Sequence, residues 1–142
     1  MKKKLDLSTT FKTQVVSGEL DLTNRSKFFI FIYVHIDLSD MHANELVKCI
    51  KMHSGPIKSL NLSKNRISDD GLVHIAKALC ESSIESVNLS GNKISEKSID
   101  SVVGSLKTHK ALKVLDLQNN AITSRVVKNK LKNALPQIDV LI

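Results

Sequence analysis

Cysteine and histidine are the residues whose chemistry would first suggest catalysis or metal binding in this chain. The two cysteines, Cys49 and Cys80, have neither a Cys-x-x-Cys spacing nor the pattern of a disulfide framework. The sequence contains no glycine-rich phosphate loop, no His-Glu-x-x-His motif and no Gly-x-Ser-x-Gly elbow. The intervals between the five histidines match no metal-ligand spacing: His35, His42, His53, His74 and His109. We therefore expect no catalysis, no bound metal and no cofactor.

A cysteine nucleophile stays open as an alternative. Cys49 lies at helical spacing from Leu46 and beside Ile50, so the expected helix would bury it as a small apolar residue. Cys80 follows Leu79 and is expected to belong to the same core. An enzyme that depends on Cys49 is the hypothesis we favour least. Unpaired cysteines also favour a reducing, cytoplasmic location.

A second set of polar residues recurs along the chain and could recognise a partner. Acids and amides stand between paired apolar residues at Asp37, Asn61, Asn88 and Asp116. Such residues can bind another protein only if the fold places them on one surface. The elements that would do so are visible as an internal repeat.

Three segments share one pattern at intervals of 27 and 28 residues, over residues 57–67, 84–94 and 112–122. Each fits L-x-x-L-x-L-x-x-N-x-L when Ile and Val are accepted for Leu. The alternation at Leu60 and Leu62 predicts a short strand with one buried and one wet face. The asparagine of each segment would serve the turn after the strand, because its amide can satisfy unpaired backbone groups. In stacked repeats these side chains would form a structural ladder: Asn65, Asn92 and Asn120.

A helix is expected after each strand. A cap-like Ser or Thr precedes each helical stretch, at Ser68, Ser95 and Thr123. Apolar residues then recur at i, i+3, i+4 and i+7, as in Leu72, Ile75, Ala76, Leu79 and in Ile99, Val102, Val103, Leu106. The third stripe holds Val127, Leu131 and Leu135, is interrupted by Lys130, and ends at Pro136.

Strand, asparagine turn and helix at this period resemble the ribonuclease-inhibitor-like class of leucine-rich-repeat proteins. The resemblance implies an α/β solenoid, with a curved parallel sheet on the concave side and helices on the convex side. We expect one domain over residues 1–142: an N-terminal cap with irregular repeats at 1–33, repeats at 34–135 and a final edge strand at 136–142. Small lysine-rich proteins of this kind also resemble effectors that intracellular bacteria such as Legionella deliver into host cells, which would place the chain in the host cytosol.

The wet face of the sheet is the predicted binding surface, because a polar second face on a parallel sheet implies an open one. Arg66 is the preferred anchor, since arginine is enriched among interface hot spots. The candidate partner-binding residues are Tyr33, His35, Asp37, Ser59, Asn61, Lys64, Arg66, Glu85, Asn88, Lys113, Asp116 and Gln118. We expect a non-catalytic monomer that forms a heterodimer with a partner protein. The resemblance implies that the partner is an enzyme and that binding inhibits or regulates it.

The net charge of +7 supports a different class of function as the alternative. Seven basic residues and one acid lie between Lys107 and Lys132, so the C-terminal third could bind nucleic acid or an anionic surface. All five aromatic residues precede residue 34, which leaves none there for base stacking. We therefore favour a solvated helical face. The longest apolar run, residues 28–34, is too short for a membrane helix of about 20 residues, and no signal peptide is expected.

Overall fold

Five short strands form one parallel sheet, in which the spatial order of the strands follows the chain. The computed structural model describes the backbone of residues 31–33 and all of residues 58–142. Their register aligns Ile32, Leu60, Val87, Leu115 and Val140 in one row across the sheet. The strands are β1 (Phe31–Tyr33), β2 (Ser59–Asn61), β3 (Ser86–Asn88), β4 (Val114–Asp116) and β5 (Asp139–Leu141).

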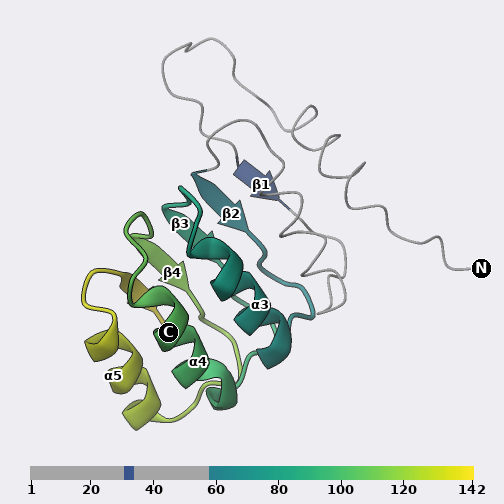
Figure 1. Cartoon of the computed structure of the whole chain (residues 1–142). Coiled ribbons are helices and arrows are strands. Elements are labelled where there is room, and N and C mark those ends of the chain that lie inside the picture. Colours follow the sequence, from purple (N-terminus) through teal and green to yellow (C-terminus); the bar gives the residue numbers. More distant parts are fainter. Residues whose placement is uncertain (1–30, 34–57) are drawn as a thin grey trace, which may run out of the picture.

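Three helices follow the strands and lie side by side on one face of the sheet (Figure 1). They are α3 (Asp69–Leu79), α4 (Ile99–Leu106) and α5 (Arg125–Ala134), and a short 3₁₀ turn, η1 (Glu96–Ser98), leads into α4. Each strand–helix unit therefore repeats the one before it, and within residues 58–142 no helix covers the other face of the sheet (Figure 1). The α/β leucine-rich-repeat architecture predicted from the pattern is confirmed.

The core between sheet and helices is aliphatic. From the strand side, Leu60, Leu62 and Leu89 are fully buried, and from the helix side Ile75 and Val102 are 1% and 0% exposed. Burying one such side chain stabilises the fold by roughly 2 kcal/mol. The stripes at i, i+3, i+4 and i+7 are thus the contact faces of the helices. In α5, the exposed Lys130 lies beside the buried Leu131, so the interruption of the stripe does not reach the core.

Two predictions about this region are wrong. Cys80 is exposed, because α3 ends at Leu79 and the chain turns there. Its thiol donates to the carbonyl of Ser105 at 2.8 Å instead of packing in the core. The cap of α5 is Ser124, whose hydroxyl accepts from the N–H of Val127, and not Thr123.

A carboxylate of the preceding repeat explains the shifted cap. Glu96 Oε1 accepts the N–H of Ser124 at 2.7 Å and that of Thr123 at 3.1 Å. Asp69 has the same role in the repeat before, where it accepts from the N–H of Ser95 at 2.8 Å and from the Ser98 hydroxyl. Partial burial acts to raise the pKa of Asp69, but these hydrogen bonds outweigh it and hold the pKa below its ordinary value of 3.8.

The predicted divisions at 1–33 and 34–135 depend largely on residues outside the described ranges. The same holds for Cys49 and its apolar stripe, and for His35 and Asp37 on the expected binding surface. At the other end, β5 pairs with β4 and buries Val140, while Ile142 packs partly against the core.

Candidate functional site

Asn92 and Asn120, in two of the turns, join adjacent repeats. Asn92, which is 8% exposed, accepts the N–H of Ile67 on Oδ1 at 3.0 Å. Its Nδ2 donates to the carbonyls of Leu62 and Leu89, both at 2.9 Å. One side chain thus satisfies three backbone groups of two repeats, in an interior where an unpaired group is costly.

Asn120 repeats this pattern in full, and Asn65 shows the part of it that lies within one repeat. Asn120 accepts the N–H of Ile94 at 3.1 Å and donates to the carbonyls of Leu89 and Leu117. Asn65 donates to the carbonyl of Leu62 at 3.0 Å. These bonds hold the turns in register, so the side chains that project from the turns have defined positions.

A row of acids and amides crosses the open face of the sheet, as the sequence indicated. Asn61, Asn88 and Asp116 are aligned by the strand register. Each uses Oδ1 to accept the N–H of the residue two positions later, at 3.0, 2.9 and 2.9 Å. This turn fixes all three side chains in one orientation. Among the described contacts it leaves the Nδ2 groups of the two asparagines, and the second oxygen of Asp116, available to a partner.

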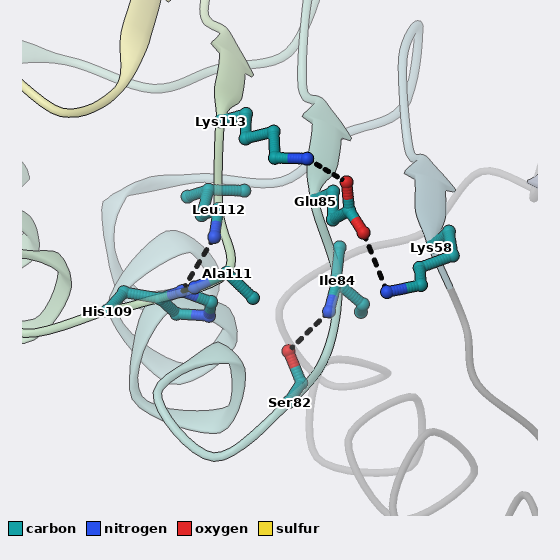
Figure 2. A network of polar contacts seen from close by, with 8 residues as sticks. All are labelled: Lys58, Ser82, Ile84, Glu85, His109, Ala111, Leu112 and Lys113. Atoms are coloured by element: carbon teal, nitrogen blue, oxygen red, sulfur yellow. Dashed lines mark hydrogen bonds and ion pairs between the residues drawn. The ribbon is translucent and has the colours of Figure 1, made fainter.

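Three charged residues form a clip at the start of the strands. The carboxylate of Glu85 accepts from Lys58 Nζ at 2.6 Å and from Lys113 Nζ at 2.5 Å (Figure 2). These hydrogen bonds, that of Lys113 first, lower the pKa of Glu85 from 4.5 to about 2. The carboxylate is therefore ionised at neutral pH, and the clip carries one net positive charge.

A cationic rim lies at the opposite ends of the strands. It consists of Lys64, Arg66 and Lys93, all exposed, in the turns after β2 and β3. The turns stack directly, because the N–H of Lys64 donates to the carbonyl of Ser90 and that of Lys93 to the carbonyl of Ile67, both at 2.8 Å.

Several predicted binding residues can be placed on the structure. Ser59 begins β2 and is half-buried, while Gln118 is exposed just after β4. Tyr33 ends β1, whose backbone pairs with Asn61. Two cations that the sequence analysis did not select, Lys58 and Lys93, lie beside the selected ones. Their repeat positions gave the signal, since Lys58 corresponds to Glu85 and Lys113, and Lys93 to Arg66.

Comparison with known families identifies the repeat. Two family models, both described as leucine-rich repeats, match this chain, one over residues 54–76 and the other over residues 83–105. The chain contains leucine-rich repeats over these residues. Proteins of this type are generally non-catalytic modules for protein–protein interaction, and that is the function class that the repeats support.

A solved structure shares the fold of this leucine-rich-repeat protein. It is the one titled "Leiomodin-1 Actin-Binding Site 2 (ABS2)", with a TM-score of 0.71 over 97% of this chain and 80% of that chain. At 16% sequence identity, this likeness shows the fold alone. No curated protein matches the chain. The ribonuclease-inhibitor-like class and the bacterial effector origin stay predictions.

Two cations of the basic C-terminal third are paired with acids of neighbouring repeats. Lys113 belongs to the clip with Glu85, and Lys130 on α5 pairs with Asp100 on α4 at 2.6 Å. Within residues 58–142, no group of three or more His, Cys, Asp or Glu could hold a metal ion. No helix in that stretch of the chain is long and apolar enough to cross a membrane.

Proposed function

We propose that this leucine-rich-repeat protein binds a partner protein through the open face of its sheet, and that binding inhibits or regulates the partner. The observation that carries the proposal is the row Asn61, Asn88 and Asp116. Three side chains held in one orientation by their own turns present preorganised polar groups, which reduces the entropy lost on binding. The three described helices occupy the other face of the sheet (Figure 1).

The solved neighbour supports a protein-binding use of this fold, since its title describes an actin-binding site. We propose that the partner is an enzyme and that the complex is a heterodimer with the chain in the cytoplasm. The sheet has five strands at a spacing of about 4.8 Å. A surface of this width can contact part of another globular protein.

The test is an affinity purification that compares variants of the open face with a variant of the helical face. Asn61→Asp with Asn88→Asp keeps the oxygen that accepts the turn hydrogen bond, because Asp116 makes the same turn in the next repeat. Each change replaces an outward amide donor with a carboxylate oxygen. Lys128→Ala with Lys132→Ala on α5 is the control for the other side of the molecule.

A partner retained by the native chain and by the α5 control, but lost with the double Asp variant, supports binding through the open face. The purified pair is then assayed for a change in the activity of the partner. Equal retention by all three proteins removes the open face from the proposal.

Binding of nucleic acid or an anionic surface through the C-terminal third is the second candidate. The exposed cations Lys107, Lys110, Arg125 and Lys132 favour it. This candidate requires affinity for RNA to fall steeply with salt and with Lys128, Lys130 and Lys132 neutralised.

A further inference from the structure

In the three described turns that border the open face at its carboxyl end, the charged residues are all cations. Residues 63–67, 90–94 and 118–122 contain Lys64, Arg66 and Lys93 and no Asp or Glu. The first two turns stack through backbone hydrogen bonds of 2.8 Å, and neighbouring strands are about 4.8 Å apart. Lys64 and Lys93 are both exposed in these stacked turns, so an anionic group beside them is favourable.

The backbone at Lys64 shows that a lysine is an unusual choice there. Its φ of 54° is in the left-handed region, which favours glycine and asparagine. The two equivalent positions hold those residue types, Gly91 with φ 68° and Asn119 with φ 56°. The chain keeps a long cationic side chain at a position where glycine would be less strained, and strain that persists in a fold points to a function of the side chain.

The open face next to this rim offers hydrogen-bond donors. Asn61 and Asn88 each use Oδ1 in their own turns, and the Ser90 hydroxyl donates to Asn88 Oδ1 as well, at 2.7 Å. These two asparagine side chains leave amide N–H donors for a partner, which suit carboxylate and carbonyl oxygens. The acids of the described face, Asp116 and Asp139, lie on β4 and β5.

The clip at the other end of β2, β3 and β4 adds to the same field. Its one carboxylate, Glu85, accepts hydrogen bonds from both Lys58 and Lys113, so the net charge of the three residues is positive. Both ends of β2 and β3 are therefore cationic, with donors between them.

We propose that the open face over β2 and β3 takes an acidic segment of the partner protein, with carboxylates at Lys64 and Lys93 and along the amides of Asn61 and Asn88. This inference rests on the proposed function and specifies the chemistry of the partner. Charge complementarity of this kind steers association and selects among partners.

The repeat itself supplies variants that keep the fold. Lys64→Gly copies Gly91, and Lys93→Ala copies Ala121, at the equivalent positions of neighbouring repeats. The matched control is Lys110→Ala with Lys132→Ala, which removes two exposed lysines outside the open face and leaves the same net charge. Arg66 is left unchanged in both proteins.

The probe is a short fluorescent peptide of alternating Glu and Ser, compared with the same peptide carrying Gln for Glu and with a single-stranded RNA. We expect the Glu peptide to bind the native chain, Lys64→Gly with Lys93→Ala to weaken it about tenfold, and the control to change it less than about twofold. Circular dichroism checks that all variants are folded.

The proposal is overturned by no binding of the Glu peptide, by equal binding of the Gln peptide, or by equal weakening in the control. RNA that binds more tightly than the peptide and depends on the rim also overturns it, since phosphate is then the occupant. In the affinity purification, one outcome is a partner lost with Asn61→Asp and Asn88→Asp but kept by Lys64→Gly with Lys93→Ala. That result contradicts the acidic segment and leaves the proposed function standing. A partner kept by both double variants contradicts the proposed function as well.

Discussion

Asn92 and Ile67 belong to different repeats and are joined by a hydrogen bond of 3.0 Å from the Ile67 N–H to Asn92 Oδ1. The side-chain Nδ2 of Asn92 donates to the carbonyl of Leu62, so Asn92 binds both sides of one turn in the preceding repeat. Both residues are buried. The link therefore holds the stacked turns together where water cannot replace it.

Replacing Asn92 by Ala should destabilise the fold by about 2 kcal/mol, because it leaves the buried Ile67 N–H without its acceptor and removes one of the two amide donors to each of the Leu62 and Leu89 carbonyls. Urea denaturation followed by circular dichroism measures this change in the free energy of unfolding. Asn129→Ala, at an exposed position of α5, should stay within about 0.5 kcal/mol of the native chain. An Asn92→Ala protein as stable as this control would show that the ladder does not hold the repeats.

Acidification should remove the stabilising effect of Glu85. Its pKa is lowered from 4.5 to about 2 in the folded chain, so its ion pairs contribute stability above pH 4.5 that is lost as the pH falls toward about 2. The native chain should unfold at a higher temperature than Glu85→Gln near neutral pH, and the two should converge near pH 2. The difference should be small, since the Glu85 side chain is 30% exposed.

Salt provides the independent check on this clip. At about 1 M salt, screening should shrink the difference between the native chain and Glu85→Gln at neutral pH. A difference in melting temperature that is constant across pH and salt would assign the effect to packing of the side chain, and not to its charge.

The repeat pattern correctly predicted the strands and turns, which depend on residues close together in the sequence. Leu60 and Leu62 alternate because the strand has one buried face, and Asn92 lies in the turn after such a strand because the turn needs an amide. Those requirements act within one repeat, so the sequence shows them directly.

Contacts between repeats were harder to predict. The sequence predicted Thr123 as the cap of α5. Its N–H instead donates to Glu96, 27 residues earlier, and Ser124 caps the helix. Cys80 follows a buried residue, yet it lies just past the last turn of α3 and is exposed. The pairing of Lys58 with Glu85 needs the strand register, which no single repeat contains.

His109 should matter as a hydrogen-bond acceptor in a loop. Its ring is buried, and Nδ1 accepts the N–H of Leu112 at 2.9 Å and that of Ala111 at 3.1 Å (Figure 2). Ser82 accepts the N–H of Ile84 in the preceding repeat in a similar way. His109→Ala should cost about 2 kcal/mol in the free energy of unfolding, because two backbone N–H groups lose their acceptor.

His109→Asn is the informative companion. The Asn side-chain oxygen is as many bonds from Cα as Nδ1 is, so it can accept from the same two N–H groups. Among the described residues, Nε2 of His109 has no partner to lose. Asn should therefore recover much of the stability lost with Ala in urea denaturation. Equal destabilisation by Asn and Ala would show that the volume of the ring is what the loop requires.

The link from Glu96 to the start of α5 should control the order of that helix. Glu96→Ala removes the acceptor for the N–H groups of Thr123 and Ser124, which should cost about 1 kcal/mol, a typical effect of losing a helix cap. Glu96→Gln keeps the accepting oxygen and gives up only the favourable charge at the helix N-terminus, worth about 0.5 kcal/mol. Stability should thus fall in the order native, Gln, Ala.

Hydrogen exchange locates the effect, because a local loss differs from a global one. In Glu96→Ala, the amides of Thr123 and Ser124 should exchange faster, while those of α3 keep their protection relative to global unfolding. Lys97→Ala changes the exposed neighbour of Glu96 and should leave the amides of α5 unaffected. Faster exchange in α5 for Lys97→Ala as well, or none in Glu96→Ala, would mean that packing of Leu131 alone orders this helix.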